Sequence, residues 1–113
     1  MAITRKQVRV KLEEGLTPIN CSKLLASFLN YKTSYRISYE AYLKRTDRPE
    51  IRVNIREILT LISLEITEGT SLEVEVESER ETYEADSLAS SIALWLEDKM
   101  ILDAHSKLPY KNV

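Results

Sequence analysis

Apolar and polar residues alternate in several short segments of the chain, and each of these segments predicts a β-strand. Residues 7–12 alternate in this way. Residues 71–77 (SLEVEVE) do so most regularly, with three glutamates on the side opposite the apolar residues. Residues 34–44 also alternate; their tyrosines would fit helical spacing as well, but the aromatic and β-branched content favours a strand. Because residues 45–50 are turn-forming, residues 50–54 are predicted to return as the second strand of a long hairpin.

The first predicted helix follows a Gly15-Leu16 turn. Thr17 is a good N-cap, because its hydroxyl can accept a hydrogen bond from a free amide of the first helical turn. Pro18 then falls at the first helical position, where its missing N–H costs nothing. The buried stripe of this helix is expected to comprise Cys21, Leu24, Leu25, Phe28 and Leu29.

Two further helices are predicted from the same spacing of apolar residues. Asn54 opens the second helix, and Glu57 three residues later completes a spacing that resembles a capping box. The third helix begins near Thr82. The apolar stripes are Ile55, Ile58, Leu59 and Ile62 in the second helix, and Ala85, Leu88, Ala89, Ile92 and Leu96, flanked by a partly buried Trp95, in the third.

The order of these elements is β-α-β-β-α-β-α, which predicts an α+β fold. We expect a four-stranded antiparallel sheet with three helices on one face and a polar outer face. The glutamates of residues 71–77 would be solvated there, or would lie beside basic residues of the first strand such as Arg9 and Lys11.

The composition indicates one compact domain. A chain of 113 residues with 43% hydrophobic and 30% charged residues can form a single core. The net charge of −2 does not indicate nucleic-acid binding. No apolar run is long enough to span a membrane, and no signal peptide is expected because residues 1–10 lack an apolar core. With one cysteine, Cys21, and one histidine, His105, no disulfide and no multi-cysteine metal site is expected. These features predict a cytoplasmic protein without metal or cofactor.

Two segments resemble the family of HPr, the small histidine-containing phosphocarrier of the bacterial sugar phosphotransferase system. Residues 14–28 (EGLTPINCSKLLASF) are similar to the family's Gly-Leu-His-x-Arg-Pro-Ala opening of the first helix. Residues 54–77 are similar to its second helix, Gly-Thr turn and last strand. The element order matches over residues 7–98, with a hairpin insertion around YLKRTDRPE. The resemblance implies an HPr-like open-faced β-sandwich in residues 1–98, followed by a C-terminal extension in residues 99–113.

The resemblance also locates the family's phosphorylation sites in this sequence. Thr17 stands at the position of the phosphorylated histidine, and Ile19 stands at the position of the arginine that steadies the phosphate. A hydroxyl cannot form the labile phosphoramidate through which the family passes phosphate onward, so no such phosphate transfer is expected. Glu57 stands at the position of the regulatory serine, either as a local helix cap or as a permanent mimic of the phosphorylated residue.

The resulting hypothesis is a regulatory domain that is not an enzyme and acts by binding another protein, with no nucleic acid or membrane involved. Ile19 would form an apolar knob with Leu16 and Pro18, or would instead pack on the second helix. A homodimer through an exposed sheet edge or through the hairpin is a further option. The expected partner-binding surface comprises Gly15, Leu16, Thr17, Pro18, Ile19, Asn20 and Ile58.

Two alternatives remain open at this point. The chain could be a signalling protein phosphorylated on a hydroxyl, of Thr17, Ser22 or Ser63. It could also be a ferredoxin-like ligand-binding domain, in which the acidic strand would lie at a sheet edge. In the C-terminal extension, Leu108 and Tyr110 could anchor an arm on a neighbouring subunit, whereas His105 is expected to face solvent.

Overall fold

The computed structural model describes residues 1–33, 38–80 and 82–99, with the side chains of residues 31–33 excepted. The elements follow the predicted order β-α-β-β-α-β-α. They are β1 (Ala2–Arg9), α1 (Pro18–Thr33), β2 (Tyr39–Arg45), β3 (Val53–Asn54), α2 (Ile58–Ser63), β4 (Ser71–Ser78) and α3 (Tyr83–Leu96). Apart from Lys99, the C-terminal extension, with His105, Leu108 and Tyr110, lies outside the described residues.

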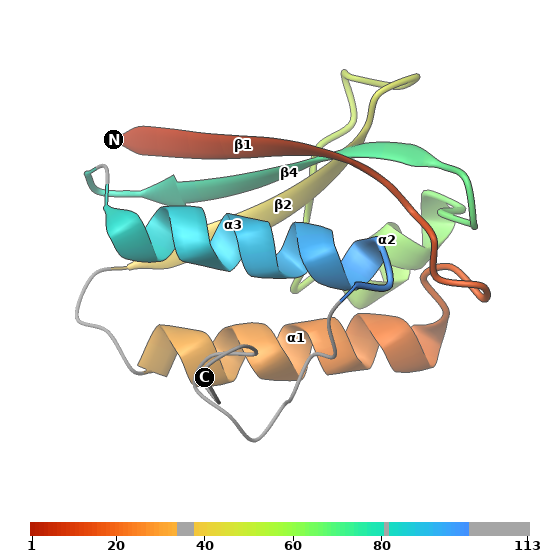
Figure 1. Cartoon of the computed structure of the whole chain (residues 1–113), viewed down its shortest axis with the longest axis horizontal. Coiled ribbons are helices and arrows are strands. Elements are labelled where there is room, and N and C mark those ends of the chain that lie inside the picture. The colour runs from red at the N-terminus through yellow and green to blue at the C-terminus, as the bar shows by residue number, and fades with distance from the viewer. Residues whose placement is uncertain (34–37, 81, 100–113) are drawn as a thin grey trace.

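The strands form a four-stranded antiparallel sheet in the order β1-β4-β2-β3. All three helices cover one face of this sheet (Figure 1). The predicted α+β architecture is therefore confirmed. The acidic strand β4 is central, between β1 and β2, which contradicts the ferredoxin-like alternative, because that alternative requires β4 at an edge.

The core lies between the sheet and the helices. The apolar residues of β4, Leu72, Val74 and Val76, are completely buried, as their alternation predicts. On β2, Tyr39 and Leu43 are buried on the same face, whereas the predicted continuation of this stripe to residues 35 and 37 falls outside the described residues. The predicted stripe of α3 is buried in full, and Trp95 is buried with it rather than partly exposed.

β1 extends further toward the N-terminus than its predicted range of residues 7–12. It pairs with β4 from Ala2 to Arg9 without interruption. Thr4 and Lys6 occupy positions on the helix-covered face, but they are polar and only half-buried, so the apolar alternation does not reach them. Lys6 Nζ lies 3.0 Å from Asp86 Oδ1 of α3, which supplies a partner for its charge. Backbone pairing, which is independent of side-chain polarity, therefore sets the length of this strand.

α2 begins at Ile58 rather than at Asn54, because Asn54 is still part of β3. The predicted capping box is not formed. The Asn54 Oδ1 atom accepts a hydrogen bond from the Arg56 amide at 2.9 Å, and Glu57 at the N-cap makes no capping hydrogen bond with its side chain.

The later start of α2 also changes which of its side chains are buried. Leu61 is completely buried in the six-residue helix, and Ile58 and Ile62 are half-buried against the core. Leu59 was predicted on the buried stripe but is 85% exposed. The prediction for Leu59 was wrong because it assumed a single helix from Asn54 onward. In the structure, the end of β3 and a turn come first, and α2 begins only at Ile58.

The hairpin insertion is attached to the end of α2 by Arg45. Its guanidinium donates to both carboxylate oxygens of Asp47 at 2.9 Å. One of its terminal nitrogens also donates to the carbonyl oxygens of Leu64, at 2.9 Å, and Glu65, at 3.1 Å. These carbonyls lie just beyond α2, where helical partners are lacking. Arg45 therefore ties the hairpin to α2.

Gly15 is required where the chain turns from β1 into α1. Its φ is +70°, and a Cβ atom there would lie 2.5 Å from the Ile66 carbonyl oxygen. We expect Gly15→Ala to lower the free energy of unfolding in urea by roughly 3 kcal/mol, because strain and steric overlap add. Gly69→Ala is the matched control, since its φ is +93° but no atom lies within 4 Å of the added Cβ. Gly69→Ala should lower the free energy of unfolding by only about 1 kcal/mol. An equal decrease for both variants would contradict this account of the turn.

Candidate functional site

The turn before α1 holds Thr17 at the start of the helix. Gly15 N donates to Leu12 O, and Leu16 N donates to Ile66 O, both at 3.0 Å, so the turn is closed by its own backbone and is fixed to the segment after α2. Thr17 Oγ1 accepts a hydrogen bond from Asn20 N at 3.1 Å. The predicted N-cap is confirmed. A cap of this kind contributes about 1 kcal/mol to stability.

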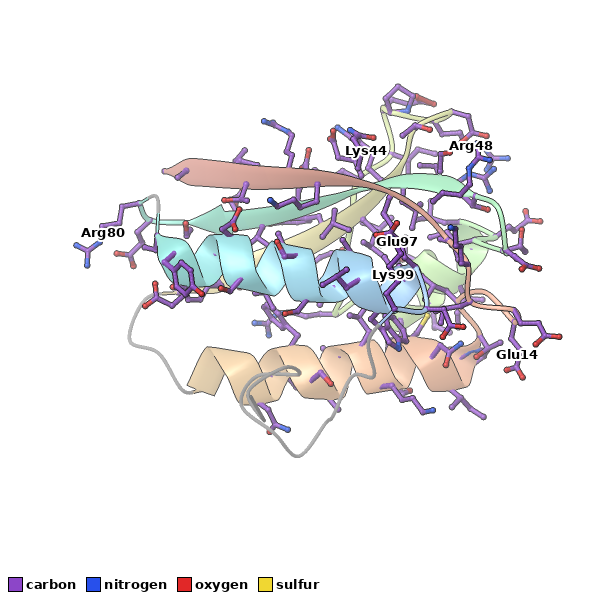
Figure 2. All side chains as sticks on the ribbon, viewed as in Figure 1. Glu14, Lys44, Arg48, Arg80, Glu97 and Lys99 are labelled. Carbon is purple, nitrogen blue, oxygen red and sulfur yellow. The ribbon has the colours of Figure 1, made fainter. Side chains whose placement is uncertain are left out.

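Asn20 closes the same turn from the helix side. Its side-chain Nδ2 donates to Gly15 O at 2.7 Å, and the residue is half-buried. Two hydrogen bonds, from the amide and from the side chain of one residue, therefore hold the turn against the first turn of α1. Glu14, one residue before Gly15, points away from the molecule (Figure 2).

Ile19 is the most exposed apolar residue of α1 among those that the structure describes. Its side chain is 69% exposed, so it does not pack on α2. Pro18 beside it is also exposed, whereas Leu16 is buried in the core and cannot form part of the expected knob. A shallow depression of about 430 Å³ opens beside Ile19 and is lined by Pro18, Ile19, Ser22, Lys23 and Ala26.

α2 packs beside α1 (Figure 1). It presents a second exposed apolar side chain at its start. This side chain is Leu59, whereas the expected surface residue Ile58 is half-buried against the core. Glu57, which directly precedes the helix, is exposed, and its side chain makes no capping hydrogen bond. The sequence offers no local signal for Leu59, because its outward position depends on where α2 begins.

Cys21 lies in the first turn of α1 but is a core residue, as expected. Its side chain is completely buried, and burial raises the pKa of the thiol. The sulfur lies 3.9 Å from Leu16 O. A buried thiol with a raised pKa is not a nucleophile near neutral pH.

The outer face of the sheet carries a carboxylate network that is centred on Glu75 of β4. Glu75 is only 2% exposed, which contradicts a solvated glutamate row, whereas the pairing of β4 with β1 agrees with the alternative that the row lies beside the basic first strand. Arg5 Nε and Lys44 Nζ lie 3.1 and 3.2 Å from Glu75 Oε2, and Arg52 Nε lies 2.7 Å from Oε1. We define the network as Arg5, Lys44, Arg52, Glu73, Glu75 and Glu77.

The basic partners in this network were not identified from the sequence, which pointed to Arg9 and Lys11. They come instead from β1, from β2 and from the residue before β3, so their convergence depends on strand order. The guanidinium of Arg52 also lies 3.5 Å from the centre of the Tyr42 ring, which favours this arrangement of the side chain. Lys44 projects from the sheet on the hairpin side of the molecule (Figure 2).

Charge pairing determines the protonation state of Glu75. Burial by itself raises the pKa of this carboxyl, but hydrogen bonds from Arg52, Arg5 and Lys44 outweigh burial and lower the pKa to about 2. Hydrogen bonds to Glu73 and Glu75 raise the pKa of Lys44 in turn. A carboxylate that stays ionised and fully paired stabilises the sheet and is unsuited to general acid catalysis near neutral pH.

Within residues 1–33, 38–80 and 82–99, no group of three or more His, Cys, Asp or Glu side chains is placed to hold a metal ion. In the same ranges, every helix is too short or too polar to cross a bilayer.

The comparisons with known proteins agree with this fold. A family model described as "PTS HPr component phosphorylation site" matches residues 4–93. The solved structure of a phosphocarrier protein HPr from Bacillus anthracis str. Ames matches with 20% identity and a TM-score of 0.59, over 85% of this chain and 99% of that chain. The crystal structure of HPr-C-His from Thermoanaerobacter tengcongensis matches with 13% identity and a TM-score of 0.54, over 87% of this chain and 99% of that chain. Among curated proteins no match was found.

The low pKa of Glu75 predicts a specific pH dependence of stability. A carboxyl whose pKa is about 2 in the folded chain and about 4.5 in the unfolded chain stabilises the fold above pH 4.5 and loses this contribution as the pH falls toward 2. Glu75→Gln should therefore be destabilised at pH 7 by on the order of 2 kcal/mol, and its difference from wild type should shrink between pH 4.5 and 2. Urea unfolding at a series of pH values measures this difference.

Glu77→Gln is the matched control for this experiment. Its carboxylate pairs with Arg52 Nη2 at 2.7 Å and is more exposed than that of Glu75. The free energy of unfolding of this variant should fall between pH 4.5 and pH 2 almost as much as that of wild type. A Glu75→Gln difference that stayed constant from pH 7 to pH 2 would contradict the role assigned to Glu75.

Proposed function

The chain belongs to the HPr family of phosphocarrier proteins, and we propose that it is a member that has lost phosphate transfer and acts by binding another protein. In this proposal it is a regulatory domain and not an enzyme. The observation that carries the proposal is the start of α1, where an N-cap hydroxyl and an exposed isoleucine are found; the resemblance aligns these two residues with the family's phosphorylated histidine and its arginine.

The first support is chemical. Phosphate transfer through this site needs an imidazole that can accept a phosphoryl group near neutral pH. Thr17 offers a hydroxyl whose oxygen already accepts a hydrogen bond from Asn20 N. The single histidine of the sequence, His105, lies far along the chain from this position.

The second support is a pair of exposed apolar side chains on α1 and α2. Ile19 is 69% exposed and Leu59 is 85% exposed, on two helices that pack side by side. We call Pro18, Ile19 and Leu59 the helix contact face. Burial of one such side chain in an interface contributes about 1.5–3 kcal/mol, which suits hydrophobic docking better than phosphate exchange.

The third support is Glu57, which stands next to this face. Because its side chain is exposed and makes no capping hydrogen bond, its negative charge is available to a partner. We therefore favour the interpretation of Glu57 as a fixed charge in place of a regulatory phosphate. A partner that suits this face would combine an apolar centre with a basic residue.

Intact-mass spectrometry tests the loss of phosphate transfer. After incubation with phosphoenolpyruvate and enzyme I, the mass should be unchanged, because position 17 lacks an imidazole. The HPr of Bacillus anthracis is the positive control. The double variant Thr17→His, Ile19→Arg should gain an acid-labile phosphoryl group if the backbone of the site is retained. Acid-stable phosphorylation of the wild-type chain on Thr17, with ATP and HPr kinase, would instead support the hydroxyl alternative.

Affinity capture from a cell extract tests the helix contact face. Ile19→Asp and Leu59→Asp should each lose a partner that the wild-type chain captures. Their unfolding free energies should stay within about 0.5 kcal/mol of wild type, because both side chains are exposed. Tyr83→Asp is the matched control, since Tyr83 is 77% exposed but lies on α3. Equal capture by all three variants and wild type would contradict the assigned face.

A further inference from the structure

The sheet has an open edge along β1. β1 pairs with β4 on one side, and on its other side the backbone of residues 2–9 makes no hydrogen bond to any described residue. The strand is eight residues long, contains no proline and pairs without a bulge. Natural edges avoid further pairing by being short, bulged, interrupted by proline or charged. Of these features β1 has only the charges, of Arg5, Lys6 and Arg9, which disfavour a basic strand but not an acidic one.

Two backbone hydrogen bonds just after β1 show which amide groups of the strand point to the open edge. Val10 N donates toward the β4 side, to Thr70 O at 2.9 Å, and Lys11 N donates away from it, to Leu96 O at 2.8 Å. Successive residues of a strand direct their N–H groups to opposite sides. The amides on the open edge are therefore those of Ile3, Arg5, Gln7 and Arg9.

The open edge is positively charged. Residues 1–12 contain four lysines or arginines and no acidic residue. Arg9 is exposed and has no ion pair or hydrogen bond with any described side chain. The side chain of Arg5 is 52% exposed and contacts Glu75 only through Nε, so the rest of its guanidinium remains accessible.

We propose that the open edge of β1 binds an extended, acidic segment of a partner protein, which adds to the sheet as a further strand. β1 already pairs with one acidic strand, β4, on its other side. There the carboxylates of β4 lie opposite Arg5 and Gln7 and accept hydrogen bonds from them. An acidic strand on the open side would place carboxylates beside Arg5 and Arg9.

A second copy of the chain fits this edge less well. Pairing β1 with β1 of another copy brings together two strands that carry only basic charges, and like charges across strands are destabilising. The proposal is independent of the helix contact face, because β1 and α1 lie in different layers of the molecule (Figure 1).

A peptide with the sequence of β4, SLEVEVES, with blocked ends, is the probe. Amide hydrogen exchange and amide chemical shifts of the full chain are followed by NMR as the peptide is added. The expected result is protection confined to the amides of Ile3, Arg5, Gln7 and Arg9, and weaker binding at high salt. A peptide with lysine in place of each glutamate should not bind.

Two charge reversals complete the test. Arg9→Glu should weaken binding of the acidic peptide about fivefold, because it replaces a favourable cross-strand pair by a repulsive one. Arg48→Glu is the control, because it makes the same charge reversal on the hairpin. β4 and β2 separate the hairpin from the open edge, so the affinity for the peptide should change by less than about twofold.

Three outcomes would overturn the proposal. Equal weakening by both variants, or equal binding of the lysine peptide, would show only general charge attraction. Absence of protection at millimolar peptide would show that the edge does not accept a strand. Protection that rises with protein concentration, without peptide, would identify a second copy as the occupant.

Discussion

The ionised and buried carboxylate of Glu75 is the constraint on which the arrangement of the sheet depends. A buried charge without partners costs several kcal/mol, so the sheet must bring cations to it. Arg5, Lys44 and Arg52 do so from β1, from β2 and from the residue before β3. Only an order with β4 between β1 and β2 places all three within reach, which links the strand order to this single side chain.

The opposite face of β4 explains where the helices lie. Leu72, Val74 and Val76 leave one wholly apolar surface, and the three helices cover it (Figure 1). The hydrogen bond from Leu16 N to Ile66 O then ties the start of α1 to the segment that follows α2. The backbone that leads into Thr17 is thus held to a segment about fifty residues away along the chain.

The proposed binding surfaces differ in their physical character. The helix contact face offers apolar side chains, and its affinity would come from burial of Ile19 and Leu59. The open edge of β1 offers backbone amides and positive charge, so its affinity would depend on salt. One small domain could therefore hold two partners, or two parts of one partner, without competition between the surfaces.

The sequence by itself determined the elements whose apolar spacing is uninterrupted, together with the family and the α+β architecture. β4 alternates without exception, α1 carries the expected N-cap at Thr17, and α3 begins directly after Thr82, close to its predicted start. Such patterns are sufficient because caps and stripes are local. Only the tertiary structure decided the length of β1, the start of α2, the exposure of Leu59 and the burial of Glu75. These features depend on backbone pairing and on charges from distant segments, which no spacing along one segment can reveal.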